Sequence, residues 1–352
     1  MVLKVSRENI LRDSIDKIDY IDTDGMQILF EDEEGRDLGG LIKDWITTIG
    51  NKIIESGALK IVPSGNYFTI DENADEDIIN FTGKLIAIAF NNKLNSNIKF
   101  TSFVWKILLK ERIALEDMKE YDDDIYQSLK WISENDVTSM DTTFVDQNDE
   151  ELIKNGRNIK LTNKNKDKYV KEMLKRIFIG KIEKLLMSFQ NGFNGYIDKY
   201  NIKQYNAKKF RDEINGYDYV DVDDWKENTK NVIYSYNYDN ESGDDNYEED
   251  NNDYSDSESQ ETINMFFKII SKWSQENLKK LLNFVTGSPI VPIGGFSHLN
   301  GGLFTIKFLS DSQRYPEAHT CFNILMLPKY NTEKQLNKKL LNVIEVEDFG
   351  LI

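Results

Sequence analysis

Apolar residues recur at spacings of three and four along most of the chain, which is the spacing of one face of an α-helix. The helices that this pattern predicts cover residues 7–18, 41–49, 77–90, 103–109, 116–135, 169–193 and 261–284. The helix over 169–193 is apolar on more than one side, so we expect it to pack on two faces. Gly83 and Ala87 are small enough to let a neighbouring helix approach closely.

Short alternating or continuous apolar runs predict strands between the helices. The expected strands are Gln27 to Phe30, a strand that ends with Phe68 and Ile70, residues 304–308, and a strand that ends at Pro328. Residues 136–168 are polar, with short strands expected at Phe144 and at 159–161. Thr332 and Gln335 form a capping box that predicts one more helix after the last strand. Helices therefore predominate, with a small α/β region near the end of the chain.

Two polar or glycine-rich segments interrupt these patterns. Residues 237–260 contain ten acidic residues and no lysine or arginine, so we expect a solvated, disordered loop. Calcium binding is an alternative, but the regular ligand loop with its central glycine and final glutamate is absent from the sequence. Glycines at 35, 39 and 40 precede a helix, yet the lysine and hydroxyl of a phosphate-binding loop are missing.

The composition limits the classes of function. A chain of 352 residues exceeds one typical core, so at least two lobes are expected. The net charge of −17 argues against nucleic acid or an anionic membrane as the main partner. No apolar run approaches 18 residues, and the first nine residues lack a hydrophobic signal core. We therefore expect a soluble protein that is not secreted by that route.

Cys321 is the only cysteine of the chain, so it cannot form an internal disulfide. If the chain is extended through this segment, His319 and Cys321 project to the same face, and the imidazole would favour the nucleophilic thiolate. The alternative is a small buried hydrophobic residue, which is the common environment of an isolated cysteine.

The residues around the cysteine are distinctive. The segment Arg314 to Asn323, followed by Leu325, Leu327-Pro328 and Tyr330, resembles the active-site signature of HECT-type ubiquitin ligases. Three further segments are similar to that family, in the family's order. They are Asp13-Ser14 with 35–41 and Trp45; residues 284–288 with 291–296; and the terminal Phe349-Gly350-Leu351-Ile352.

The resemblance implies a bilobal α+β fold. We expect a mainly helical N-lobe over 1–286, with a small conjugating-enzyme-binding sublobe at about 137–236 and the acidic tract 237–260 as an insertion. A hinge at 287–290, centred on Gly287 and Ser288, would lead to a small α/β catalytic C-lobe over 291–352.

The same resemblance implies the chemistry. Cys321 would accept ubiquitin as a thioester from a ubiquitin-conjugating enzyme and pass it to a substrate lysine, with no cofactor or metal. His319 would tune the thiol or hold the loop, and Thr320 and Asn323 would orient the thioester or satisfy the backbone of a turn. Phe349 would act in the transfer step, or else close the C-lobe core.

The conjugating enzyme would dock on two helices. The residues that match the family's docking groove are Ile125, Ser128, Leu129, Tyr169 and Met173. Two apolar stripes beyond the needs of the core would form an exposed patch for a partner; the alternative is that these side chains are ordinary core.

Two other functions remain open at this point. One is a cysteine hydrolase with His298 or His319 as its base, and the other is an inactive adaptor that binds the conjugating enzyme without chemistry. A single free thiol fits a reducing interior, so we expect the cytoplasm, with the nucleus as the alternative.

Overall fold

A computed structural model of the chain describes residues 2–20, 26–31, 40–217, 219–236, 257–309 and 313–345. These residues form two compact units. The first, called here the cysteine unit, consists of 1–48, 93–97 and 215–352, and the second, the helical unit, of 49–92 and 98–214. Phe349, the glycines at 35 and 39, and residues 237–256 of the acidic tract lie outside the described residues.

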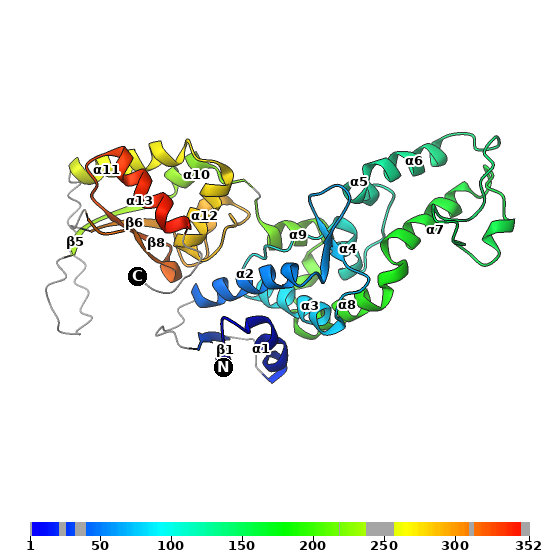
Figure 1. Ribbon diagram of the computed structural model, residues 1–352, viewed down its shortest axis with the longest axis horizontal. Coiled ribbons are helices and arrows are strands. Elements are labelled where there is room, and N and C mark those ends of the chain that lie inside the picture. Colours follow the sequence, from blue (N-terminus) through cyan, green and yellow to red (C-terminus); the bar gives the residue numbers. More distant parts are fainter. Residues whose placement is uncertain are drawn as a thin grey trace. The chain divides into compact units, whose positions relative to one another are not determined.

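The helices and strands of the cysteine unit are coloured along the chain in Figure 1. They are β1 (Val2–Val5), α1 (Ile10–Lys17), η1 (Ile18–Tyr20), β2 (Gln27–Phe30), the start of α2 (Gly40–Glu55), α10 (Val222–Glu227), β5 (Thr229–Tyr236), α11 (Ser257–Ile270), α12 (Gln275–Thr286), η5 (Gly295–His298), β6 (Phe304–Leu309), β7 (Glu317–His319), η6 (Thr320–Phe322), β8 (Ile324–Pro328) and α13 (Glu333–Glu345).

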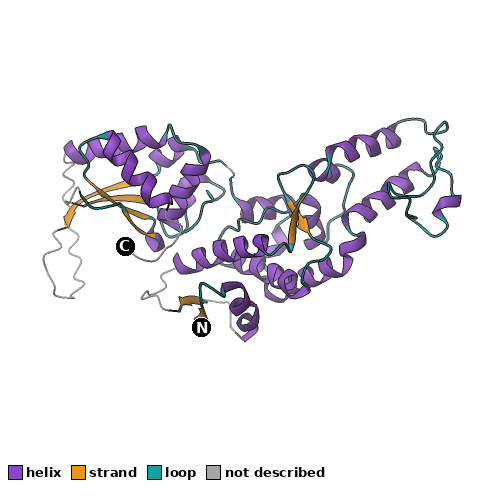
Figure 2. Ribbon diagram, viewed as in Figure 1, coloured by secondary structure: helices purple, strands orange, loops and turns teal. Residues whose placement is uncertain are grey.

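A four-stranded sheet in the order β5-β6-β8-β7 forms the base of this unit. The β5–β6 and β6–β8 pairs are parallel, with Ile306 opposite Leu325, while β7 runs antiparallel to β8. Parallel neighbours need crossover connections, and helices α11 and α12 lie in the one between β5 and β6. Figure 2 shows these helices with α13 over the sheet. The expected strands at 304–308 and before Pro328 are confirmed.

One hydrophobic core joins these helices to the sheet. It includes Val220 and Trp225, the apolar residues of α11 and α12, and those of β6, β8 and α13. The indole of Trp225 stacks on the ring of Phe296, with centroids 4.7 Å apart and planes at 17°. Residues from both sides of 287–290 thus share a single core. The expected lobe boundary at that position is wrong, because α11 and α12 belong with Cys321 and not with a separate N-lobe.

Gly287 and Ser288 close a helix inside this core. Gly287 adopts the left-handed conformation with φ 73°, and its amide donates to the carbonyl of Asn283 at 2.8 Å, which is how a glycine ends a helix. The amide of Ser288 donates to the Thr286 hydroxyl at 3.2 Å. These bonds hold the predicted hinge as a structured turn.

The N-terminal part of the cysteine unit pairs β1 with β2 in parallel. The indole Nε1 of Trp45 donates to the Ser14 hydroxyl at 2.9 Å, and both side chains are fully buried. This bond joins two segments that were singled out in the sequence and lie 31 residues apart. The helix expected over 7–18 and the strand expected over Gln27 to Phe30 are confirmed by α1 and β2.

The helical unit holds the end of α2 and a set of elements without a large sheet (Figure 2). They are β3 (Leu59–Ile61), β4 (Phe68–Ile70), α3 (Glu76–Asn91), α4 (Ser102–Leu108), α5 (Asp117–Tyr121), α6 (Asp123–Glu134), η2 (Gly156–Asn158), α7 (Lys166–Phe178), η3 (Gly180–Ile182), α8 (Glu183–Tyr196), η4 (Asn201–Gln204) and α9 (Ala207–Asn215).

Helices α3 and α8 pack backbone to backbone in this unit. A Cβ added at Gly83 would lie 2.1 Å from the carbonyl oxygen of Phe189, and one at Gly192 would lie 1.9 Å from that of Asn80. Only glycine leaves room for this approach. The expectation of close packing at Gly83 is confirmed.

Two predicted helices are each divided in the structure. The one expected over 116–135 breaks at Asp122, whose Oδ1 accepts the amide of Ile125 at 3.0 Å and so caps α6. The one expected over 169–193 breaks at Ile179–Ile182 into α7, the 3₁₀ turn η3 and α8. In place of the strands expected near Phe144 and 159–161, the described residues show isolated bridges such as that between Thr143 and Lys160.

Residues 137–236, which were predicted to form one sublobe, do not pack together as a single group. Helices α6 and α7 run side by side in Figure 1 and enclose a small core at residues such as Phe144. Helix α9 instead packs on α3, where the rings of Phe90 and Phe210 lie 5.0 Å apart. Val220 and Trp225 belong to the other unit. None of the described helices has the length and apolar character needed to cross a membrane.

Candidate active site around Cys321

Cys321 lies on a tight turn between two antiparallel strands. Strand β7 ends at His319, residues Thr320–Phe322 form the single 3₁₀ turn η6, and β8 starts at Ile324. The chain is therefore not extended through the cysteine, and the premise that placed His319 and Cys321 on one face is wrong. His319 is exposed at the end of its strand, and Thr320 is half-buried at the start of the turn.

Asn323, the residue that follows the turn, stabilises it from the buried side. It adopts the left-handed conformation with φ 54°, which asparagine tolerates better than most residues, and its side chain is fully buried. Its Nδ2 donates to the carbonyl of Asn300 at 3.0 Å and to that of Gly302 at 2.6 Å. Its own carbonyl accepts the amide of Thr305 at 2.9 Å. Of the two roles expected for Asn323, these contacts support satisfaction of the backbone.

A lysine from α2 reaches the same loop. Nζ of Lys43 donates to the carbonyl of Asn300 at 2.5 Å and lies 3.4 Å from Oδ1 of Asn323. Burial lowers the pKa of Lys43 from its ordinary 10.5 to about 8, and the charge of the Cys321 thiolate acts in the opposite direction. The Cys321 turn, the glycine loop at 299–302 and the start of α2 thus meet at one point.

The thiol itself is free and partly exposed. Phe322, the next residue, is 50% exposed, so the turn presents both side chains at the surface. The described residues contain no group of histidine, cysteine and acidic side chains that could hold a metal ion. An accessible thiol on a rigid turn is suited to nucleophilic chemistry.

The segment before β7 is fixed by side chains from later in the chain. The Tyr330 hydroxyl donates to the carbonyl of Arg314 at 2.7 Å, and burial raises the pKa of Tyr330 above its usual range. Nζ of Lys339 lies 3.7 Å from the centre of the Tyr315 ring and donates to the carbonyl of Gln313. The motif that precedes the cysteine is therefore packed against α13.

The His298 side chain makes its hydrogen bonds within its own loop. Its Nδ1 lies 3.0 Å from the carbonyl of Gly294 and 2.9 Å from the Ser297 hydroxyl. This arrangement matches a side chain that holds the short helix η5, and it gives no support to His298 as the base of a hydrolase.

The residues expected to bind a conjugating enzyme are divided by the structure. Ser128 is exposed and Ile125 half-buried on α6, whereas Leu129, Tyr169 and Met173 are buried. Tyr169 also packs edge-on against Phe144, with ring centres 5.4 Å apart. The expectation that all five form an exposed patch is wrong, because the latter three fill the core between α6 and α7.

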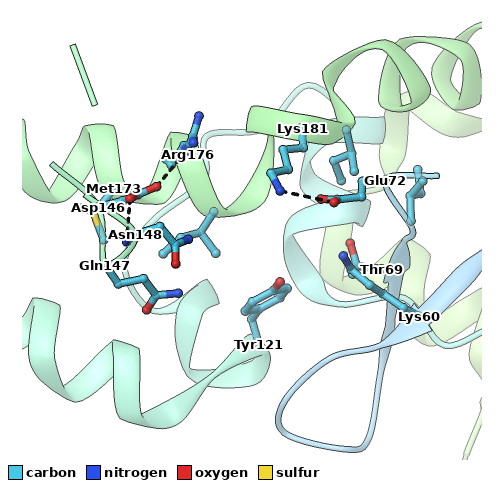
Figure 3. Close-up of a pocket in the computed structure, with 13 residues that line it drawn as sticks. Lys60, Thr69, Glu72, Tyr121, Asp146, Gln147, Asn148, Met173, Arg176 and Lys181 are labelled. Atoms are coloured by element: carbon cyan, nitrogen blue, oxygen red, sulfur yellow. Dashed lines mark hydrogen bonds and ion pairs between the residues drawn. The ribbon is translucent and has the colours of Figure 1, made fainter. Parts of the chain in front are cut away.

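The helical unit also contains a polar cavity of about 240 Å³. Arg176 pairs with Asp146 at 3.1 Å and Lys181 pairs with Glu72 at 3.3 Å, as the dashed lines in Figure 3 mark. Tyr121 lines the same cavity. Burial is the larger cause that raises the pKa of Tyr121, and the negative charge of Asp122 is the smaller one. No cysteine lines the cavity, because Cys321 belongs to the other unit, so the cavity has no feature of a thiol-based site.

Sequence reasoning missed Lys43, Asn300 and the glycines that follow Asn300. The available signal was the pair Gly301-Gly302, whose φ angles of 95° and 105° require glycine. Lys43, placed between the apolar Ile42 and Trp45 of a helical stripe, gave a weaker signal. The contact between Lys43 and Asn300 joins residues that are 257 apart in the chain, and a local sequence pattern cannot predict a contact over such a separation.

Comparison with protein families gives one match that covers most of the chain. The model described as HECT-domain (ubiquitin-transferase) matches residues 51–352.

Known proteins give the same result over nearly the whole sequence. The chain is 30% identical to E3 ubiquitin-protein ligase ptr1 of Schizosaccharomyces pombe over 376 aligned positions, which cover 99% of the chain and 11% of that protein. It is 30% identical to E3 ubiquitin-protein ligase Nedd-4 of Drosophila melanogaster, covering 97% and 34%. It is 29% identical to E3 ubiquitin-protein ligase RSP5 of Chaetomium thermophilum, covering 97% and 42%. The chain thus spans less than half the length of these relatives.

Proposed function

The chain belongs to the HECT-domain (ubiquitin-transferase) family, and from this membership we propose that it accepts ubiquitin on Cys321 and transfers it to a protein substrate. The observation that carries the proposal is the position of the only cysteine of the chain, partly exposed on a turn that Asn323 and Lys43 hold in place.

The proposed reaction has two steps. The Cys321 sulfur attacks the thioester carbonyl carbon of a ubiquitin-charged conjugating enzyme, forms a new C–S bond and releases that enzyme's thiol. A neutral substrate amine then attacks the Cys321 thioester, an amide N–C bond forms, and the C–S bond to Cys321 breaks. The released thiolate recovers a proton equivalent to the one that the amine loses. In the first step one sulfur replaces another on the same carbonyl carbon, so positioning contributes more than a change in leaving group.

The turn supports the first step physically. Asn323 bonds the end of the turn to the glycine loop, and the antiparallel pair of His319 with Ile324 joins the two strands that flank the turn, while Cys321 stays partly exposed. A fixed, accessible nucleophile lowers the entropic cost of reaching the attack geometry. The relatives are named as ligases, and the hydrolase and adaptor alternatives have no observation in their favour.

We place the docking site of the conjugating enzyme on the exposed side of α6. Ser128 and Trp131 lie three residues apart and so share one side of the helix, and Trp131 is 48% exposed. Large exposed aromatic residues are typical anchors of protein interfaces. Ile125 flanks them, whereas Leu129, Tyr169 and Met173 support the two helices from within.

The proposed reaction needs a free thiol, which the cytoplasm and the nucleus maintain, and we expect the protein to act there.

Transfer to Cys321 is tested with activating enzyme, a panel of conjugating enzymes and ubiquitin. The proposal predicts an adduct that disappears on treatment with a thiol reductant and does not form with Cys321→Ala. A conjugating enzyme that discharges equally fast onto substrate with Cys321→Ala would overturn it, because an adaptor needs no thiol.

A further inference from the structure

Lys43 is a buried lysine without a carboxylate partner among the described residues. It is 7% exposed, and it forms no ion pair with any described acidic residue. Charged side chains are rarely buried without a partner, because removal of a charge from water is costly. The contacts that it does make are all with the loops that surround the active-site turn. Because burial of Lys43 beside the active-site turn costs stability, we look for its role in the function of the turn.

The acceptors of Lys43 are Asn323, which ends the Cys321 turn, and Asn300, to which Asn323 is itself bonded. Asn300 gives its carbonyl oxygen both to Nζ of Lys43 and to Nδ2 of Asn323, and Asn323 turns its Oδ1 toward Nζ. The three groups therefore form a closed triangle. Each member limits the movement of the other two, which is the arrangement expected of a positioning network.

The glycine next to Asn300 brings the cysteine itself into this network. A Cβ added at Gly301 would lie 2.6 Å from the carbonyl oxygen of Cys321 and 3.3 Å from Nζ of Lys43. Both groups thus crowd the same glycine. A small cavity of about 40 Å³, lined by Lys43, Asn300, Asn323 and other residues, adjoins the site.

We propose that Lys43 is a positioning residue for transfer through Cys321, which holds the turn of Thr320–Phe322 in its attack geometry through Asn300 and Asn323. This inference rests on the proposed function of Cys321. It assigns the start of α2, which precedes the residues matched by the family model, to the catalytic machinery. Lys43 does not touch the transferred group; it acts through the two asparagines.

The test compares Lys43→Met with Lys52→Met. Methionine keeps the apolar stem of lysine and removes every donor, while Asn300 keeps its bond from Asn323. Lys52 lies on the same helix α2, with its side chain 46% exposed and bonded to Glu55 at 2.8 Å, and serves as the matched control. Single-turnover transfer from a charged conjugating enzyme is followed at increasing enzyme concentration.

A positioning role predicts a change in rate without a change in binding. For Lys43→Met we expect the maximum rate of Cys321 loading to fall roughly 10- to 100-fold, since misplacement of a reacting group has effects of this size, and the half-saturating concentration to stay the same. Lys52→Met should match the wild type in both. Equal maximum rates for Lys43→Met and wild type, or a loss that lies wholly in the half-saturating concentration, would overturn the proposal.

A second measurement does not depend on ubiquitin. Hydrogen exchange of the Thr305 amide, which is bonded to the carbonyl of Asn323, should become about tenfold faster in Lys43→Met. Unchanged exchange would overturn the proposal even if transfer were slower. If the wild type forms no thioester while exchange still rises, the proposed function fails and the positioning contact stands. A variant that melts far below the wild type would show Lys43 to be an ordinary stabilising residue, which also contradicts the proposal.

Discussion

Asn323 Nδ2 lies 2.6 Å from the carbonyl oxygen of Gly302, so the turn that carries the cysteine is bonded to a glycine loop from earlier in the chain. The two sides of the contact constrain each other. Asn323 is in the left-handed conformation, and Gly301 and Gly302 both have positive φ angles. The backbone of the active-site turn is thus set by conformations that few residues adopt.

Substitution of Asn323 separates its backbone role from its hydrogen bonds. Asn323→Gly keeps the left-handed conformation and removes the side-chain bonds, so we expect a loss of roughly 1–3 kcal/mol in the free energy of unfolding. Asn323→Ala should lose about 1 kcal/mol more, because alanine is strained at φ 54°. Urea unfolding of the three proteins measures both effects. Equal stability of the two variants would show that the conformation carries no strain.

The contact between α3 and α8 makes a prediction within one helix. Gly192→Ala places a Cβ against the Asn80 carbonyl and should destabilise the protein by more than about 1 kcal/mol, since overpacking costs roughly 1–3 kcal/mol. Gly195 lies on the same helix with open space around it, so Gly195→Ala should be neutral or stabilise by up to about 1 kcal/mol. Thermal unfolding followed by circular dichroism compares the pair. Equal melting temperatures of Gly192→Ala and Gly195→Ala would contradict the close approach of α3 and α8.

On the paired helices α6 and α7, stability and binding should respond to different residues. Leu129→Ala removes a side chain that is 2% exposed and should cost roughly 2–5 kcal/mol of stability. Trp131→Ala removes one that is 48% exposed and should leave the melting temperature nearly unchanged. It should instead weaken binding of the conjugating enzyme by about 1 kcal/mol or more, as anchors of an interface do. Calorimetry with a conjugating enzyme decides this; unaltered affinity in Trp131→Ala would place the docking site elsewhere.

The buried lysine makes stability depend on pH. The pKa of Lys43 is about 8 in the folded protein and 10.5 ordinarily, so between these values the unfolded chain binds more protons, and stability rises with pH. The full shift corresponds to about 3 kcal/mol at 1.36 kcal/mol per pKa unit. Below pH 8 the penalty is fully present, and it disappears as the pH rises toward 10.5. Lys93 and His298 line the same small cavity and are present in both proteins compared below.

The measurement is the stability difference between Lys43→Met and wild type at pH 7 and at pH 10. The difference should move in favour of the wild type by an amount on the order of 2 kcal/mol between these values. A difference that is independent of pH would mean that Lys43 keeps its ordinary pKa and is not desolvated.

Local patterns in the sequence located most helices and strands, and they failed where distant contacts decide. The strand over Phe304–Leu309 alternates and is flanked by turns, so it could be predicted. The break between α7 and α8 could not, because Gly180 interrupts an apolar pattern that continues on both sides. The boundary at 287–290 was misplaced for a related reason. A glycine that ends a helix inside a core has the same sequence signature as one in a linker.

The candidate site shows the same limit. Cys321 could be identified because it is the only cysteine and lies in a distinctive motif. Its turn could not be predicted, since the short strand β7 and the 3₁₀ turn depend on pairing with β8. The buried state of Leu129 and Tyr169 also follows from packing, because an amphipathic helix does not reveal whether its apolar stripe meets its own chain or a partner.

The central claim is that ubiquitin is carried on Cys321, and mapping the site of a trapped adduct tests it most directly. With Cys321→Ser, a charged conjugating enzyme should give an oxyester that resists thiol reductants, is cleaved by base, and maps by peptide mass spectrometry to position 321. An adduct that resists base and maps only to lysines, together with full activity of Cys321→Ala, would contradict the account.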